Sequence, residues 1–471
     1  MDKHVLFAAA AFLLAAVLVP RLYAEDGAAP IRPSASNPRY WEYNGKTVLL
    51  IGGSREDNLF QIPDLRDHLD ILAACGGNYI RNTMSARDDG NVWPFYQRDD
   101  GKYDLERLND EYFNRLEQCL KWSLERDIIV QIEMWDRFDY ARDVWRRNPY
   151  RPANNVNYGT NQSGLKNEYP NHPGSNENPF FFTVPALRNN ELILKYQRAQ
   201  VDRLLSISLK YPNVLYCMDN ETSGDPAWGA YWSDYIKAAA ARKGVEVHTT
   251  EMWDDWNLRG NAHRATLDHP EQYSFADISQ NNHNSGQKHW DALQWAREYV
   301  SQRPRPLNNV KIYGANGGRF GNDRDGTERF WRNLIGGAAS VRFHRPDSGI
   351  GLNETAQAHI RSARMFVEKF DLVRAQPDVE SKLLLQREPN EAYLTTLANG
   401  RYAVYFPNGG EVTLDAPEFA GHCLVEWLDI EKSEWHTPVS SDRTMLTTPG
   451  TGHWVAVVQA NVNAGRASGR S

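Results

Sequence analysis

Short apolar runs that end in polar residues alternate along most of the chain with longer stretches whose apolar residues recur at three- and four-residue spacing. The first pattern predicts buried strands, and the second predicts amphipathic helices. Eight strands are expected, at residues 48–51, 78–82, 128–133, 214–219, 245–250, 275–280, 310–313 and 340–344. Helices are expected at 65–74, 108–126, 192–211, 228–243, 289–302, 327–335 and 356–369.

This alternation predicts an α/β protein whose eight parallel strands close into a (β/α)₈ TIM barrel over residues 39–372. A doubly wound sheet is the competing architecture, but no Gly-x-Gly-x-x-Gly follows the first strand, so a dinucleotide-binding fold has little support. A β-hairpin is expected just before the first barrel strand, because Asn44-Gly45 favours a type I′ turn.

The pattern changes after residue 372 to short alternating strands, which predict a small antiparallel β-sandwich domain at 373–460. Turns are expected at Asn399-Gly400 and at Asn408-Gly409-Gly410, and residues 461–471 are expected to be a disordered tail. A structural role for this domain is favoured over sugar binding. The strands are expected at 392–397, 402–406, 411–414, 423–428 and 454–458.

The N-terminus has the pattern of an export signal. Lys3 and His4 precede an apolar run over 5–19, and Leu22-Tyr23-Ala24 ends in a small residue. A cleaved signal peptide at 1–24 is therefore expected, with a secreted or periplasmic protein that has no membrane partner after cleavage. A membrane anchor is less favoured, because the run is shorter than the ~20 residues that a spanning helix needs. Residues 25–38 are expected to form a mobile lead-in.

Composition narrows the classes of partner. The net charge of -7 provides no basic field for a polyanion, so nucleic acid is not expected as a partner. The four cysteines are widely spread without zinc-like spacing, so buried thiols are expected, although a disulfide stays open. No metal or cofactor is expected, and the oligomeric state is not determined by the sequence. The long segment 139–185 is rich in aromatic residues, which predicts an ordered lid or cleft wall.

The candidate chemistry follows from the barrel, because barrel enzymes place their active sites at the carboxyl ends of the strands. The apolar run 214–218 leads directly into Asp219, Asn220 and Glu221 at the end of the fourth strand. Further acids, amides, arginines and histidines end the other strands. Acids at one cleft can divide into a protonated acid and an ionised partner, which is what cleavage of a glycosidic bond needs.

The catalytic candidates are Glu221, Glu251 and Glu133, which lie at the ends of the fourth, fifth and third predicted strands. Arg81 is expected to pair with an acid at the rim or to contact substrate, and Trp135 could stack on a sugar ring. The full set of expected substrate-binding residues is Asn220, Arg81, Asp57, Trp135, His283, Asn316, His344 and Arg345. The predicted partner is thus a carbohydrate, and the predicted activity is hydrolysis of O-glycosidic bonds in a polysaccharide or oligosaccharide.

Several motifs in order along the chain resemble glycoside hydrolase clan A, and more closely the apiosidase-like hydrolases that carry an appended β-sandwich domain. This resemblance covers most of the chain after the signal and implies the acid/base role for Glu221 with Asn220 as its neighbour. The motifs are Tyr43-Asn44-Gly45-Lys46, Asn78-Tyr79-Ile80-Arg81, Asn220-Glu221, the run 402–410 and Val425-Glu426-Trp427.

The seventh strand departs from the clan pattern, which has a nucleophilic Glu at its end. Residues 311–318 of this chain offer the amide Asn316 instead. Either Glu251 or Glu133 substitutes, or water attacks directly, or the barrel only binds sugar. A retaining pair of carboxyl groups stands ≈ 5–5.5 Å apart and an inverting pair ≈ 6.5–9.5 Å apart. A noncatalytic carbohydrate-binding protein and a polysaccharide lyase are the alternatives to a hydrolase.

Overall fold

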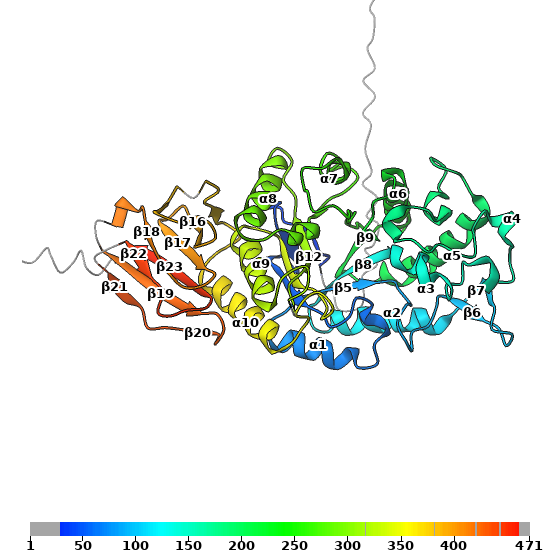
Figure 1. Cartoon of the computed structure of the whole chain (residues 1–471), viewed down its shortest axis with the longest axis horizontal. Helices are drawn as coiled ribbons and strands as arrows, with labels where there is room; N and C mark the ends of the chain where they lie inside the picture. Colours follow the sequence, from blue (N-terminus) through cyan, green and yellow to red (C-terminus); the bar gives the residue numbers. More distant parts are fainter. Residues whose placement is uncertain (1–28, 316, 381, 420–421, 442–443, 461–471) are drawn as a thin grey trace, which may run out of the picture.

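The computed structural model describes residues 29–460 except 316, 381, 420, 421, 442 and 443. An α/β barrel is followed by two antiparallel sheets that lie at one end of the long axis of the molecule (Figure 1). The expected signal peptide at 1–24 and the expected tail at 461–471 lie outside the described residues.

The barrel sheet contains eight strands that pair in parallel in the order β10-β9-β8-β5-β4-β13-β12-β11, which confirms the TIM-barrel prediction. Every residue of these strands is buried. The terminal strands β10 and β11 are short, and Asp277 N donates across them to Thr250 Oγ1 at 3.1 Å. The strands are β4 (Leu50–Gly53), β5 (Tyr79–Thr83), β8 (Ile129–Asp136), β9 (Val214–Asn220), β10 (Thr249–Thr250), β11 (Ala276–Asp277), β12 (Leu307–Ile312) and β13 (Ser340–Phe343).

Each helix predicted from the apolar spacing is present. Asx residues fix several starts; for example, Asn322 accepts hydrogen bonds from the backbone N–H of Arg324 and Asp325 and caps α9. The short helix α7 (Asn261–Leu267) was not predicted, because seven residues carry too few apolar repeats. The predicted helices are α1 (Leu65–Ala74), α2 (Asp110–Leu124), α5 (Glu191–Ser208), α6 (Pro226–Arg242), α8 (Gly286–Tyr299), α9 (Asp323–Ile335) and α10 (Glu354–Lys369).

The predicted hairpin joins β2 (Trp41–Tyr43) to β3 (Lys46–Val48), with φ of 50° at Asn44 and 73° at Gly45. The Trp41 side chain is fully buried and donates to Asn308 Oδ1 at 3.0 Å. The prediction of a mobile lead-in is wrong from Ile31 onward. Ile31 is buried, and β1 (Arg32–Pro33) pairs antiparallel with β2, so this segment gains backbone hydrogen bonds and apolar contacts.

The segment between β8 and α5 is ordered by aromatic packing, as predicted for a cleft wall. The ring of Tyr140 stacks on Phe180 with centroids 4.0 Å apart. The segment is built from η2 (Arg137–Tyr140), α3 (Arg142–Trp145), η3 (Pro152–Asn154), α4 (Thr160–Ser163), η4 (Pro173–Ser175) and η5 (Pro179–Phe182). A separate hairpin of β6 (Phe95–Gln97) and β7 (Tyr103–Leu108) precedes α2, and η1 (Leu59–Gln61) precedes α1.

The C-terminal sheets form the predicted β-sandwich around a core that includes Val404, Phe406 and Leu414. One sheet has the order β14-β16-β17-β23-β19-β20, with β21 also on β19, and the other has the order β15-β18-β22. The strands are β14 (Gln376–Pro377), β15 (Leu384–Leu385), β16 (Tyr393–Leu397), β17 (Arg401–Phe406), β18 (Glu411–Leu414), β19 (Cys423–Asp429), β20 (Glu434–Trp435), β21 (Val439–Ser441), β22 (Met445–Thr447) and β23 (Trp454–Ala460), and η7 (Pro417–Phe419) lies before β19.

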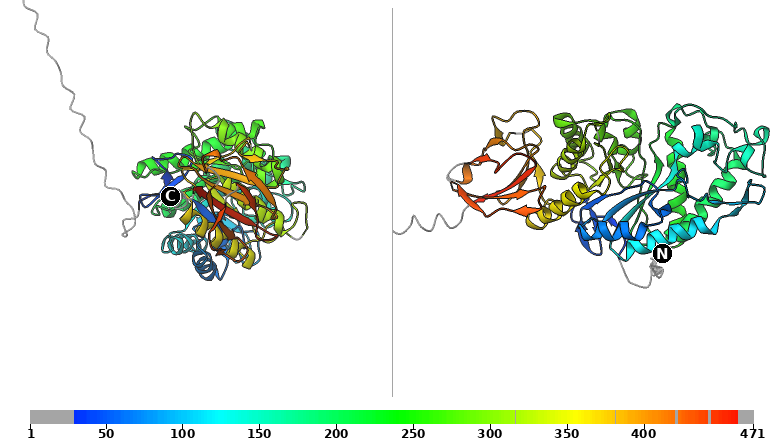
Figure 2. Two further views of the ribbon diagram at one scale, coloured as in Figure 1. Left: turned by 90° about the vertical axis from the view of Figure 1, so that its left-hand side faces the viewer. Right: turned by 60° about the horizontal axis from the view of Figure 1, so that its bottom comes forward.

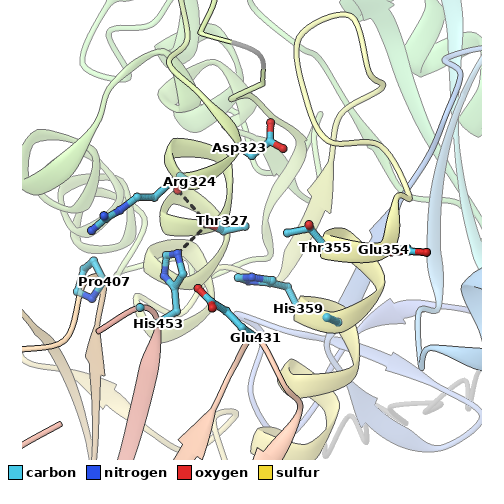
Figure 3. A pocket seen from close by; sticks show the side chains of 11 residues that line it. Asp323, Arg324, Thr327, Glu354, Thr355, His359, Pro407, Glu431 and His453 are labelled. Atoms are coloured by element: carbon cyan, nitrogen blue, oxygen red, sulfur yellow. Dashed lines mark hydrogen bonds between the residues drawn. The ribbon is translucent and has the colours of Figure 1, made fainter. Parts of the chain in front are cut away.

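The sandwich packs on α9 and α10 of the barrel, and Figure 2 shows α10, in yellow, between the two domains. A cavity of ≈ 460 Å³ lies at this junction (Figure 3). His453 from the sandwich contacts Thr327 Oγ1 of α9 at 3.0 Å and Tyr405 Oη at 2.9 Å, and His359 of α10 lies beside it. The hydrogen bond between His453 and Thr327 joins the two domains beside the cavity.

Candidate active site

A second cavity, of ≈ 500 Å³, lies at the carboxyl ends of the barrel strands. Its walls come from the segments that follow β4, β5, β8, β9, β10, β12 and β13, together with η6 (Ser279–His283) after β11. These segments meet there because the carboxyl ends of all parallel barrel strands share one rim. The lining residues are Asp57, Arg87, Phe138, Ala141, Arg142, Val144, His172, Pro173, Asn220, Glu221, Asp254, His283, Lys311, Tyr313, Arg319, Phe320, His344, Arg345, Asp347 and Ser348.

Glu221 follows the last residue of β9 and has a left-handed backbone, with φ of 54°. Such a conformation is uncommon for a residue with a side chain, and surrounding contacts must hold it. The next residue supplies one of these contacts, because Thr222 N donates to Met252 O at 2.8 Å. The chain thereby turns out of the strand at the point where the Glu221 side chain lines the cavity.

Three side chains donate hydrogen bonds to one oxygen of the Glu221 carboxylate. Gln280 Nε2, Lys311 Nζ and Tyr313 Oη lie 2.8, 2.7 and 2.9 Å from Oε1, respectively. The other oxygen, Oε2, accepts no hydrogen bond from the described residues. The side chain keeps 17% of its surface accessible. Glu221 is therefore held firmly through Oε1, while Oε2 is left for a molecule in the cavity.

The charge state of Glu221 is decided by Lys311. Burial raises the pKa of Glu221, but the Lys311 ammonium and the three hydrogen bonds outweigh it, so the pKa lies far below its usual value. Lys311 comes from β12, has a side chain only 3% exposed, and also donates to Asn220 Oδ1 at 2.5 Å. The site thus holds Glu221 as a carboxylate. This state suits a nucleophile or a base, whereas a general acid needs the opposite state.

Asp254 is the second carboxyl group that lies accessible in the cavity beside Glu221. Partial burial and the negative charge of Glu221 raise the pKa of Asp254. No ion pair with Asp254 is formed by the described residues. The two acids therefore differ in the way that acid/base chemistry requires, because one is held ionised and the other is pushed toward the protonated form.

The two acids predicted as partners of Glu221 do not line the cavity. Glu251 is 1% exposed, and its Oε1 accepts from the backbone N–H of Asp219 and Met252 at 2.9 and 3.0 Å. Gly229 makes room for it, because a Cβ there would lie 2.2 Å from Glu251 Oε2. Glu133 is fully buried and accepts from Arg81 Nε at 2.6 Å. Both carboxyl groups are sealed inside the barrel, so the structure does not support direct contact with a substrate.

Arg81 and Trp135 are also interior residues, which corrects their prediction as substrate contacts. Arg81 is fully buried between Glu133 and Asp57, so it is the structural ion-pair partner that the sequence offered as its alternative role. Trp135 is 1% exposed and packs against Phe180 and Trp232 with centroids 5.4 and 5.2 Å apart. Its side chain belongs to the aromatic core behind the cleft wall, because barrel-strand residues that face outward pack against the surrounding helices.

Five of the predicted contact residues do line the cavity: Asp57, Asn220, His283, His344 and Arg345. Burial alone would raise the pKa of Asp57, but Arg81 and its neighbours His344, Arg345 and Arg87 hold it well below the usual value. Asp57 is thus an ionised residue that organises the cations around it. Asn316 lies outside the described residues.

Sequence reasoning missed the importance of Lys311, Tyr313, Asp254 and Arg319. One signal was present for Lys311, because a lysine between Val310 and Ile312 in a buried strand is rare unless the ammonium group is paired. Tyr313 also forms the base of an aromatic surface, since Phe320 stacks on it with centroids 4.2 Å apart and both rings line the cavity. These two rings, and not Trp135, are the aromatic side chains of this region that line the cavity together.

Within residues 29–460, apart from the six omitted positions, no cluster of three or more His, Cys, Asp or Glu side chains is arranged to hold a metal ion. None of the helices in the same described part of the chain is long and apolar enough to span a membrane. The four cysteines are buried.

The chain matches no family model, and no curated protein is similar to it in sequence. Solved structures are similar in fold. A glycoside hydrolase family 5 structure from Bacteroides vulgatus has a TM-score of 0.62 at 12% identity and covers 92% of this chain and 93% of its own. Another structure described as a glycoside hydrolase has a TM-score of 0.60 at 11% identity and covers 92% of this chain and 97% of its own.

A family 5 mannosidase from Rhizomucor miehei covers 72% of this chain and 98% of its own, with a TM-score of 0.50 at 11% identity. At these identities the likeness establishes the architecture, a TIM barrel with a C-terminal β-sandwich. The first two structures match it over nearly the whole described chain, so the arrangement of the two domains is shared as well.

Proposed function

We propose that this protein is an exported glycoside hydrolase that cleaves O-glycosidic bonds in a polysaccharide or oligosaccharide. One observation carries the proposal. Glu221 ends the fourth barrel strand, is held ionised through Oε1 by Lys311, and leaves Oε2 in an open cavity beside a second carboxyl group, Asp254. Two acids with pKa values pushed apart in one cleft are what glycosidic cleavage requires.

Asp254 is the proposed general acid, which donates its proton to the leaving glycosidic oxygen. Glu221 is the proposed nucleophile, or the base that removes a proton from an attacking water. Asn220 is positioned by Lys311 beside the reacting centre, and Tyr313 with Phe320 provides the face on which a sugar ring stacks. These assignments replace Glu251 and Glu133, whose carboxyl groups are enclosed, with a group that the substrate can reach.

The comparisons support the reaction class, because the structures with the same two-domain architecture are described as glycoside hydrolases. Closer kinship with the apiosidase-like hydrolases and export through a cleaved signal at 1–24 are part of the proposal. They rest on the order of the sequence motifs and on the apolar N-terminal run.

The test is product analysis with the purified protein on a panel of plant, algal and microbial glycans. Hydrolysis generates new reducing ends without new ultraviolet absorbance, and Glu221→Gln should abolish them while the protein stays folded. Binding of a glycan without any new reducing end would replace the hydrolase with a noncatalytic carbohydrate-binding protein.

A polysaccharide lyase is the second candidate, because strand β12 supplies Lys311 and Tyr313 where clan A enzymes carry a carboxylate. In that reaction Glu221 would remove the proton at C5 of a uronate, the C4–O bond would break, and a double bond would form between C4 and C5. Glu221 would keep the C5 proton, and Asp254 would donate a second proton to the departing oxygen. Unsaturated products that absorb in the ultraviolet would establish this reaction and overturn hydrolysis.

A further inference from the structure

We infer that the cavity at the barrel mouth binds an anionic saccharide, one whose carboxylate or sulfate groups are held by Arg142 and Arg319. The inference names the substrate class for the proposed function and rests on that proposal only in taking the ligand to be a saccharide. It depends on which of the charged side chains in the cavity already have partners.

Three of the five lysines and arginines that line the cavity are matched by carboxylates. Lys311 pairs with Glu221 at 2.7 Å. Arg87 lies 2.5 Å from Asp136 and 3.0 Å from Asp57. Arg345 lies 2.7 Å from Asp347 and 3.3 Å from Asp57. The carboxylates neutralise these three cations, so their attraction for an anionic ligand is weak.

Arg142 and Arg319 remain. Neither forms an ion pair with a carboxylate anywhere in the described part of the chain. Arg319 donates to His283 Nδ1 at 3.0 Å and lies over the ring of Phe320, so its guanidinium is oriented without being neutralised. Both side chains are exposed and line the cavity, so a ligand can reach them without breaking a buried contact.

The two arginines come from segments that follow strands on opposite sides of the barrel. Arg142 follows β8, the third barrel strand, and Arg319 follows β12, the seventh. Three strands lie between β8 and β12 in either direction around the eight-stranded barrel, so the two strands stand opposite each other. A saccharide that crosses the cavity past Glu221 therefore meets a guanidinium on each side. This placement suits a chain that carries an anion on more than one sugar.

The acids of the cavity do not oppose such a ligand. Asp57, Glu221 and Asp347 are each paired with a cation. Asp254 is the lining acid that lacks an ion pair within the described residues, and its raised pKa favours the neutral form. Planar guanidinium groups present paired N–H donors that match the oxygens of carboxylate or sulfate, which is why arginine recognises these groups so often.

The experiment measures binding of matched oligosaccharide pairs to Glu221→Gln protein by calorimetry, so that turnover does not interfere. One arm compares oligouronates with their methyl esters, which keep the sugar and remove the charge. The other compares sulfated oligosaccharides with their desulfated forms, and neutral mannan oligosaccharides serve as reference. We expect one anionic form to bind at least about tenfold more tightly than its neutral counterpart. The preference should weaken as salt is raised.

Arg142→Gln and Arg319→Gln, added to Glu221→Gln, should each reduce the affinity for the anionic form about tenfold and leave the neutral form unchanged. Arg374→Gln, on a surface arginine that is 83% exposed and pairs with Asp371, is the matched control. Equal or tighter binding of the neutral forms, or a preference that survives both substitutions, would overturn the inference. Cleavage of neutral glycans alone would keep the hydrolase and reject the anionic substrate. Anion-dependent binding with no cleavage by the wild-type protein would keep the anionic ligand and reject the hydrolase.

Discussion

The barrel mouth and the domain junction contain cavities of nearly equal size, ≈ 500 and ≈ 460 Å³, and both are lined by histidines and acids. They differ in what the charges do. At the mouth, buried cations hold Asp57 and Glu221 ionised, and partial burial together with the charge of Glu221 raises the pKa of Asp254. At the junction, burial lowers the pKa of His453 to about 4, which keeps the imidazole neutral.

This difference teaches that volume does not mark a functional site, whereas displaced protonation equilibria at accessible carboxyl groups do. The junction histidine uses both ring nitrogens in contacts, Nε2 with Thr327 of the barrel and Nδ1 with Tyr405 of its own domain. The mouth instead leaves Glu221 Oε2 without a hydrogen bond, and Arg142 and Arg319 without an ion pair, within the described residues. One cavity contains a contact that joins the two domains, and the other keeps ionisable groups open to a ligand.

The largest expected effect separates the two cavities directly. Glu221→Gln removes the ionised oxygen that the proposed chemistry needs, so kcat/KM should fall by roughly 10³-fold or more. Glu431→Gln changes an acid at the junction cavity and should leave kcat/KM within about twofold. Initial rates of reducing-end release on an accepted glycan measure both. Equal losses of kcat/KM in the two variants would show that the cavity at the barrel mouth is not the active site by this criterion.

Asp254→Asn tests the second acid of the mouth. Because the proposed proton donor is lost, kcat should fall about 10²-fold on natural glycans, whereas aryl glycosides with good leaving groups should lose much less. The alkaline limb of the pH profile should also disappear. Asp255→Asn, on the next residue of the same loop, controls for disturbance of the loop. An equal loss on both substrate types would show that Asp254 is not the acid.

Lys311→Met sharpens the electrostatic part of the comparison. With the cation removed, burial raises the pKa of Glu221, so the ionised fraction at acidic pH falls. The acid limb of the kcat/KM profile should move upward by more than about one pH unit, and the rate at pH 6 should fall about tenfold. Lys288→Met, on the exposed face of α8, is the control. An unchanged pH profile would show that Lys311 does not control the pKa of Glu221.

The smallest expected effect is a pH dependence of stability caused by His453 at the domain junction. The pKa of His453 is about 4 in the folded protein, below the value near 6.5 of an unfolded chain, so protons favour the unfolded state. Its contribution to stability is full above pH 6.5 and is lost as the pH falls toward 4. From pH 7 to 5.5 the free energy of unfolding should drop by about 1 kcal/mol on this account.

His453→Gln should remove that part of the pH dependence and leave activity at pH 7 unchanged. Urea unfolding at the two pH values measures it, with His269→Gln, at an exposed position, as control. An unchanged pH dependence in the His453 variant would show that other groups set the acid sensitivity of the junction.

The sequence predicted the elements well because each depends on local spacing. The helix at 65–74 has the predicted bounds, and β9 begins at the predicted Val214. The position of Glu221 at a strand end also followed from the apolar run before it. The sequence did not predict which acids after a strand point into the cavity and which are enclosed. Glu251 and Asp254 lie three residues apart in one loop, and only packing against α6 decides that the first is enclosed and the second is open.

The sequence by itself determined that eight strands alternate with helices, that a β-sandwich follows, and that position 221 lies at the rim. These features are local, because periodicity and turn chemistry act over a few residues. The tertiary structure alone decided that Lys311, ninety positions away, holds Glu221 ionised, that Trp135 is core, and that Arg142 and Arg319 both line the cavity without an ion pair from the described residues. Charge pairing and burial depend on which strands become neighbours when the barrel closes. The spacing of residues along the chain does not determine this.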